Sequence, residues 1–375
     1  MIWTQHLLGI GHLKRAAVLA RATSAAGADV TLVSGGFPVS DLDIGGASLV
    51  QLPLLRAMDS SFSGLATKDG TPPDPAFLRA RRDQLLSLFA QTQPDVLVTE
   101  MYPFGRRQLA FELEPLLEAA RASGHCAIIC SVRDILTAKK KRARYDEMAD
   151  VVLGYYDSVL VHGDPTLIPF DVTFPAVARI AHLIHYTGYV RESHVEAPHS
   201  DASNYDVVVS AGGGAVGDAL LEAALTARPK STLAASRWLL LAGATRSDDE
   251  IAQLRNQAPN GVDIERSRAD FQNLLRHARV SISQAGYNTV MDIVDTRVSA
   301  ILVPFVGDGE TEQTTRATRM SQCGLAQVVT EHELAGPSLA NAIDRALLAP
   351  APPDNMIDCD GADASAAIIM SHTST

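Results

Sequence analysis

The sequence predicts an α/β protein made of two doubly wound, parallel-sheet domains of the Rossmann type. Runs of Val, Ile and Leu without polar alternation recur along the chain, which is typical of parallel strands covered by helices on both faces. Helix-like stretches separate these runs, and such alternation favours a parallel sheet. The alternation stops once, over 191–204, and then resumes. We therefore expect an N-terminal domain over 1–190, a linker over 191–204 and a C-terminal domain over 205–350.

Length and composition agree with this prediction and exclude several classes of protein. A chain of 375 residues is long enough for two domains. Its 46% hydrophobic and 20% charged residues exclude a mostly disordered chain. Acidic residues number 43 and basic residues 32, so the net charge is −11. This charge argues against a protein that binds nucleic acid through its phosphates.

The elements of the first domain follow from its pattern in order. An apolar run ends at Leu8, and an amphipathic helix follows over 13–27 and closes at Gly27. Further strands are expected at 28–36, 47–54, 94–100, 126–132 and 157–163. Further helices are expected at 78–91, 105–123 and 139–150.

The second domain resumes the alternation after the linker. Its strands are expected at 205–214, 237–243, 261–267, 279–286, 299–305 and 326–331. Its helices are expected to begin at positions 218, 248, 270, 288 and 312. A Pro-rich segment then breaks the pattern, and 351–375 is expected to be a tail with one last helix.

The loops that follow strands are the expected location of function. Ligands of open α/β sheets bind beyond the carboxyl ends of the strands, so we expect two domains that face a cleft. In the first loop, Gly9 and Gly11 allow a tight turn, but the third glycine of the dinucleotide fingerprint is missing. His12 is either a structural histidine or a base that titrates near neutral pH, and its place after a strand favours the base.

A glycine-rich loop opens the second domain. Gly212, Gly213 and Gly214 offer backbone N–H groups before a helix, an arrangement that binds anions. The Lys-Ser/Thr of a P-loop is absent, which argues against a nucleoside triphosphatase. An ordinary glycine-rich turn explains these residues equally well.

A later turn of the second domain offers a second phosphate cradle. Its candidate residues are Ser283, Gln284, Gly286, Tyr287, Asn288 and Thr289. The alternative is a plain helix cap formed by the Asn or Thr side chain. Asp292 lies about one helical turn further on, where a carboxylate can accept both hydroxyls of a ribose.

Polar acceptors also follow the strand over 299–305, and they include Asp308, Glu312 and Gln313. They are either binding groups or a solvated loop whose acidic residues favour the start of a helix.

Together these loops resemble the donor-binding domain of GT-B glycosyltransferases, in particular the bacterial lipid II-forming N-acetylglucosaminyltransferases with a glycosyltransferase family 28 C-terminal domain. The His-Cys-Gly-Trp-Asn-Ser-x-x-Glu signature of such enzymes is similar to residues 284–292, and their Asp/Gln-Gln pair to Glu312-Gln313. The Gly-His of the lipid II-forming enzymes resembles Gly11-His12. Segment 9–20 also resembles the UDP-sugar hydrolase of pseudaminic acid synthesis.

The resemblance implies an inverting transferase of the hexosyltransferase type. It would move a sugar from a nucleotide sugar, expected to be UDP-linked, to an acceptor hydroxyl that His12 deprotonates. The implied donor contacts are Gly212, Gly213, Gly214 and the 283–289 turn for the diphosphate, Asp292 for the ribose, and Asp308, Glu312 and Gln313 for the sugar. A UDP-sugar hydrolase, an epimerase of the same fold and a non-catalytic nucleotide-sugar-binding subunit stay open as alternatives.

Two departures from the family pattern bear on the donor site. Gln284 stands where a histidine is common, so that phosphate contact would be uncharged. Asp292 replaces Glu and is one methylene shorter. We expect no metal or further cofactor, because no Asp-x-Asp motif lies in a suitable loop and 246–250 and 307–310 are the nearest segments.

Further candidates lie at carboxyl ends of strands in the first domain. Glu100, Arg133 and Asp134 face the acceptor or assist His12, or they form salt bridges in βα loops. The basic cluster 139–144 is either a solvated helix face or a contact for anionic headgroups or a phosphorylated acceptor. The acceptor itself is a glycan, a lipid-linked sugar or a small molecule.

Cysteine spacing and hydropathy suggest the compartment. The four cysteines lack zinc-like spacing and are expected to be free thiols. We identify no signal peptide and no apolar run of about 18 residues. The expectation is a soluble cytoplasmic protein, with peripheral membrane contact left open.

Overall fold

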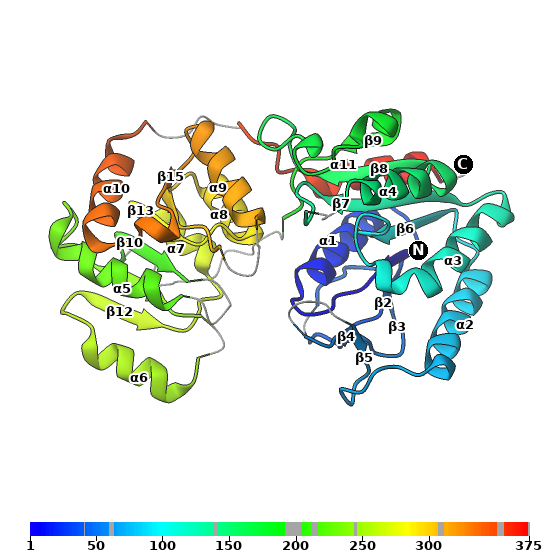
Figure 1. The fold of residues 1–375 in the computed structure, drawn as a ribbon, viewed down its shortest axis with the longest axis horizontal. Coiled ribbons are helices and arrows are strands. Elements are labelled where there is room, and N and C mark those ends of the chain that lie inside the picture. Colours follow the sequence, from blue (N-terminus) through cyan, green and yellow to red (C-terminus); the bar gives the residue numbers. More distant parts are fainter. Residues whose placement is uncertain are drawn as a thin grey trace. The chain divides into compact units, whose positions relative to one another are not determined.

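The computed structural model describes residues 1–40, 42–59, 64–138, 141–191, 204–211, 217–243, 246–306, 311–350 and 356–373. The chain forms two compact units, Met1–Glu192 with Asp358–Thr375, and Ser193–Ile357 (Figure 1). The C-terminal segment, red in Figure 1, thus belongs to the first unit.

The first unit is built on a seven-stranded sheet in the order β3-β2-β1-β6-β7-β8-β9. Every neighbouring pair in it is parallel. The strands are β1 (Ile2–Thr4), β2 (Thr31–Ser34), β3 (Ser48–Gln51), β6 (Val96–Glu100), β7 (Ala127–Arg133), β8 (Ser158–His162) and β9 (Ile184–Tyr186). The chain runs outward from β1 in one direction and from β6 in the other, which is the doubly wound topology.

Helices cover both faces of this sheet. They are α1 (Gly11–Ala25), α2 (Pro75–Thr92), α3 (Ala110–Ser123), α4 (Ala143–Tyr155) and α11 (Gly361–Ser371). Successive residues of β6 enter different cores, because side chains alternate along a strand. Leu97 packs in the core lined by α2, α3 and α4, whereas Val96 and Val98 pack in the core lined by α1 and α11.

Short elements complete the first unit. The hairpin of β4 (Arg56–Ala57) and β5 (Leu65–Ala66) is antiparallel. The single-turn helices of its described residues are η1 (Arg107–Leu109), η2 (Phe170–Val172), η3 (Val177–Arg179) and η4 (Ala181–Leu183).

The second unit is a six-stranded parallel sheet in the order β12-β11-β10-β13-β14-β15. Its strands are β10 (Val207–Ser210), β11 (Trp238–Leu241), β12 (Val262–Glu265), β13 (Val280–Ser283), β14 (Ser299–Leu302) and β15 (Gln327–Val328). Its helices are α5 (Asp218–Ala227), η6 (Arg228–Lys230), α6 (Asp248–Gln257), α7 (Phe271–His277), α8 (Tyr287–Thr296), α9 (Glu312–Gln322), η7 (Glu331–Glu333) and α10 (Gly336–Leu348). The predicted fold class of two doubly wound parallel sheets is confirmed.

Several predicted boundaries were wrong. The first strand stops at Thr4 rather than Leu8, because its partner β2 ends at Ser34, which pairs with Thr4. The helix predicted from position 139 begins at Ala143 and continues to Tyr155. No helix among the described residues is long and apolar enough to cross a membrane.

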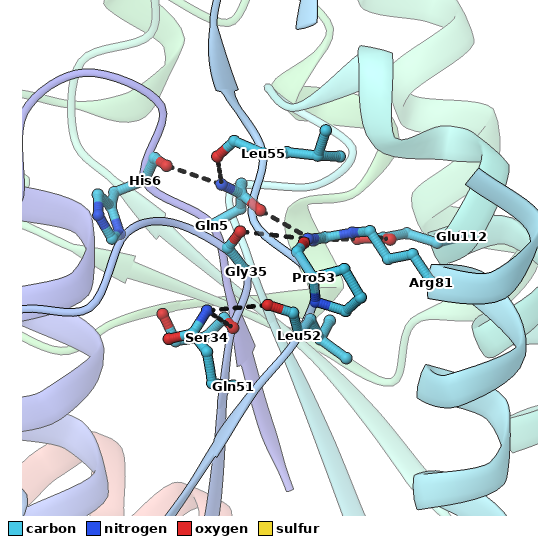
Figure 2. A network of polar contacts seen from close by, with 10 residues as sticks. All are labelled: Gln5, His6, Ser34, Gly35, Gln51, Leu52, Pro53, Leu55, Arg81 and Glu112. Carbon is cyan, nitrogen blue, oxygen red and sulfur yellow. Dashed lines mark hydrogen bonds and ion pairs between the residues drawn. The ribbon is translucent and has the colours of Figure 1, made fainter. Parts of the chain in front are cut away.

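A buried ion pair fixes three loops at the carboxyl edge of the first sheet (Figure 2). Arg81 on α2 donates to Glu112 on α3, with Nε 2.6 Å from Oε2. Its Nη1 also donates to the carbonyls of Pro53 and, at 3.1 Å, Gly35, and its Nη2 to Gln5 Oε1 at 2.9 Å. Both charged side chains are 0% exposed. The loops that follow β1, β2 and β3 are therefore tied to one guanidinium.

Candidate active site

The predicted base His12 contacts Glu100 in the first unit. β6 ends at Glu100, whose side chain is 1% exposed. His12 is the second residue of α1 and lies next to this carboxylate. His12 Nδ1 lies 2.7 Å from Glu100 Oε1. The His12 side chain is 21% exposed. The contact agrees with the expectation that Glu100 assists His12, while the catalytic role of the pair stays a prediction.

The charges around this pair decide its protonation. Burial raises the pKa of Glu100, but the positive charge of His12, Arg15 and Arg106 outweighs it, so the net pKa falls to about 2. Burial lowers the pKa of His12 to about 4, against the opposing attraction of Glu100. At neutral pH Glu100 is thus ionised and His12 neutral. An ionised carboxylate only accepts hydrogen bonds, so we assign the imidazole proton to Nδ1, and Nε2 carries the lone pair.

Two arginines that the sequence analysis did not single out join the pair. Arg15 Nη2 donates to Glu100 Oε1, and the Arg15 side chain is 7% exposed. Arg106 is close enough for its charge to lower the pKa of both His12 and His6. A usable signal was present for Arg15, because it lies three residues after His12 on one helix and so shares its face.

The backbone after Glu100 has an unusual conformation. Met101 (φ 68°) and Arg106 (φ 58°) both have positive φ. Gln93 and Arg297 also do, but they end helices in the ordinary left-handed way. Positive φ in a non-glycine residue is strained and concentrates at functional sites. The segment between Met101 and Arg106 therefore supports the placement of function beside Glu100.

Arg133 and Asp134 lie one strand further along the sheet. Arg133 is the last residue of β7, and Asp134 is fully buried. The Asp134 carboxylate accepts from Tyr189 Oη at 2.7 Å and from the Ile135 N–H at 2.9 Å. These contacts hold the loop after β7, while a role toward an acceptor stays a prediction.

In the second unit the predicted cradle is a βα turn. β13 ends at Ser283 and α8 begins at Tyr287 after the cap residue Gly286. The helix has no side-chain cap, and Asn288 and Thr289 lie within its first turn. The alternative of a plain Asn or Thr cap is therefore wrong, and the turn leads directly into the N-terminus of a helix, which favours anions.

The start of α9 is tied to this turn. Gln313 Oε1 accepts from the N–H groups of Ala285 at 3.1 Å and Phe305 at 3.2 Å. Arg316 donates to the Ala285 carbonyl at 3.1 Å and to Glu312 Oε1 at 2.9 Å. Two predicted donor loops are thus brought together by α9, and Arg316 was missed because its sequence context resembles any solvated helix.

Arg316 also packs on an aromatic residue of the turn, with its guanidinium carbon 5.5 Å from the ring centre of Tyr287. Asp292 lies on α8, in the turn after Asn288. Its place on the helix is thus as predicted, while its contact with a ribose stays a prediction.

Some predictions lie outside the described residues: Gly212, Gly213, Gly214, Asp308 and the positions 139–140 of the basic cluster. Within the described parts of the chain, no group of three or more His, Cys, Asp or Glu residues is placed to hold a metal ion. In the segment 246–250, Ser247 and Glu250 form a capping box and Asp248 pairs with Arg266. The described cysteines are free.

A family model matches most of the second half of the chain. Residues 207–370 match the glycosyltransferase family 28 C-terminal domain. Solved structures extend the likeness to the whole fold. The MurG protein of Acinetobacter baumannii aligns with a TM-score of 0.63 at 14% identity, over 99% of each chain. The chain has the GT-B fold.

Other GT-B structures align similarly. The glycotransferase of kitacinnamycin gives a TM-score of 0.63 at 15% identity over 99% of this chain and 94% of its own. CalG4, the calicheamicin glycosyltransferase, gives 0.59 at 15% identity over 99% and 94%. Identities this low establish the fold of this GT-B protein and not its substrates.

Curated relatives match a shorter stretch. They are named UDP-N-acetylglucosamine--N-acetylmuramyl-(pentapeptide) pyrophosphoryl-undecaprenol N-acetylglucosamine transferase. The one from Prochlorococcus marinus is 36% identical over 78 residues, which is 21% of this chain and 22% of the relative. One from Synechococcus sp. is 32% identical over 101 residues, 27% of each chain. The match therefore spans about a quarter of these relatives.

Proposed function

We propose that this GT-B protein is an inverting glycosyltransferase that moves a sugar from a UDP-sugar to an acceptor hydroxyl. The carrying observation is the 2.7 Å contact between His12 Nδ1 and Glu100 Oε1 at the carboxyl edge of one sheet, in a chain whose other half matches a family 28 domain. A neutral imidazole with a free lone pair is the group that a hydroxyl needs as a base.

The donor assignment rests on the second unit. The curated relatives are named for a UDP-linked sugar, and this supports UDP as the nucleotide here. We assign the diphosphate to Gly212–Gly214 and to the turn before α8, and the ribose to Asp292. We assign the sugar hydroxyls to Asp308, Glu312 and Gln313.

The proposed reaction needs one base and one leaving group. His12 Nε2 takes the proton of the acceptor hydroxyl, and the oxygen attacks the anomeric carbon from the face opposite UDP. The bond from that carbon to the UDP oxygen breaks as the new bond forms, so the configuration inverts. The N-terminus of α8 stabilises the negative charge that develops on UDP, in place of a metal ion.

The acceptor is proposed by class only. The relatives' names include a pyrophosphoryl-undecaprenol group, so a lipid extract is the first acceptor source to test. Glu100 orients the base, and Arg133 and Asp134 line the same edge of the sheet. We propose a cytoplasmic location for the reaction.

The test is to incubate the full chain with a panel of nucleotide sugars and to follow free UDP, with and without a lipid extract of cells. We expect UDP release from one or a few UDP-sugars that depends on the extract and is unchanged by EDTA. Equal release without extract would instead indicate a hydrolase. Binding without any release would contradict an enzyme, and loss of activity with EDTA would contradict metal independence.

A further inference from the structure

Glu100 uses one carboxylate oxygen for two partners. Oε1 accepts from His12 Nδ1 at 2.7 Å and also from Arg15 Nη2. The other oxygen, Oε2, is buried and has no hydrogen-bond partner in the part of the chain that the structure describes. Apart from His12 itself, Arg15 therefore supplies the contact that fixes the rotation of this carboxylate.

Arg15 is built into the first unit rather than placed on its surface. It is 8% exposed, and its helix α1 packs in the core with α11. Arg15 Nη2 also lies 3.2 Å from His12 Nδ1. Nδ1 donates its proton to the ionised carboxylate, so it cannot also accept from Arg15. This second contact is therefore electrostatic: it places the guanidinium charge beside the imidazole ring.

We propose that Arg15 is the positioning residue of the His12–Glu100 pair: it holds the carboxylate so that Oε1 binds the proton on Nδ1 and the lone pair stays on Nε2. This inference rests on the proposed role of His12 as a base. Arg15 touches neither donor nor acceptor in this account, and it acts only through Glu100 and through its charge.

Other charged groups face the same pair and have to be separated from Arg15. Arg106 follows β6 and lowers the pKa of His12, as Arg15 does. His162 on β8 is buried, which lowers its pKa to about 3, with Arg15 adding to the effect. His162 therefore stays neutral across the useful pH range and does not confuse the measurement.

Removal of the Arg15 charge should change the pKa of His12. A nearby positive charge disfavours the protonated imidazole, so its loss raises the pKa of His12. We expect Arg15→Gln to raise the pKa of His12 by about one unit or more. Arg15→Lys keeps the charge, so the pKa should stay within about half a unit of wild type, but the ammonium cannot hold the carboxylate as a guanidinium does.

The experiment follows the His12 imidazole by NMR in the full chain across pH, and His12→Ala identifies its signal among the 11 histidines. This readout needs no turnover, so it stands even if the proposed transfer is not found. Arg21→Gln is the matched control, since Arg21 is on the same helix and pairs with Asp43 at an exposed site. It should leave the His12 titration unchanged.

Where transfer is measurable, turnover gives the second readout. Arg15→Lys should lower kcat roughly tenfold to a hundredfold through misplacement of the base, with an unchanged denaturant midpoint of the first unit as evidence of folding. An unchanged His12 titration in folded Arg15→Gln would overturn the proposal. If Arg15→Gln does not fold, full turnover of Arg15→Lys would overturn it as well.

Discussion

At the scale of single residues, Gln313 shows how structure and ligand compete for one side chain. The resemblance assigns it to the donor sugar, yet its carbonyl accepts from the backbone N–H groups of Ala285 and Phe305. The oxygen therefore holds the loops that follow β13 and β14. Its amide nitrogen is the atom that we propose for the sugar.

Two substitutions separate these roles. Gln313→Ala should weaken the binding of both UDP and the UDP-sugar, because the loops lose their shared acceptor. Gln313→Glu keeps an oxygen acceptor but removes the amide donor and adds a negative charge beside the proposed diphosphate site. UDP affinity should therefore fall somewhat, and UDP-sugar affinity should fall roughly tenfold further. Calorimetric titration of both ligands measures this. Equal losses for the two ligands in Gln313→Glu would refute a sugar contact.

At the scale of elements, α2 and α3 are joined by the Arg81–Glu112 pair, which also ties the loops after the first three strands (Figure 2). Loss of one partner leaves a buried charge without compensation. Glu112→Gln should therefore lower the free energy of unfolding by about 3–5 kcal/mol. Denaturant unfolding measures it.

The neighbouring exposed pair provides the control. Arg82 and Asp83 are 35% and 60% exposed, and Asp83→Asn should change stability by less than about 1 kcal/mol. Similar effects from the two substitutions would mean that the buried network contributes nothing special to the first unit.

The sequence predicted elements where hydrophobic periodicity is strong and missed elements that are very short or that begin with turn-like residues. Strand β6, with its buried run, was found to within two residues. The edge strand β9 is three residues long, too short for a periodic signal. Helix α10 was missed because Gly336-Pro337 resembles a turn, although proline is well tolerated at a helix start.

The candidate site was predicted in part for a similar reason. His12 and Glu100 stood out because polar side chains follow strands there. Their pairing, and the arrival of Arg15, depend on contacts across 85 to 88 residues. Only the β1–β6 neighbour relation of the finished sheet sets these contacts.

At the scale of the whole molecule, the chain returns to its first unit at the C-terminus. Ile369 on α11 is 4% exposed and packs in the core with α1. The Tyr189 N–H donates to the Asp358 carbonyl at 2.8 Å. This hydrogen bond joins the end of the N-terminal part of the first unit to the start of its C-terminal part. The last residues thus complete a core that the first twenty residues begin.

This arrangement predicts where a substitution in the last helix is felt. Ile369→Ala should destabilise the first unit by about 2–4 kcal/mol, because a buried branched side chain leaves a cavity. Hydrogen exchange should then speed up in β1, β2 and α1, and stay unchanged in the strands of the second unit. Leu348→Ala, at a site 86% exposed, is the control. Faster exchange in both units alike would contradict the assignment of α11.

The central claim is that His12 is the base, and single-turnover rates across pH test it most directly. Turnover of the wild type should hold down to about pH 5 and fall below it, because the base is lost as pH drops through a pKa of about 4. His12→Ala and His12→Asn should cut the rate by about 10²- to 10⁴-fold and keep UDP affinity. A His12→Ala protein with wild-type rates would remove His12 from the mechanism.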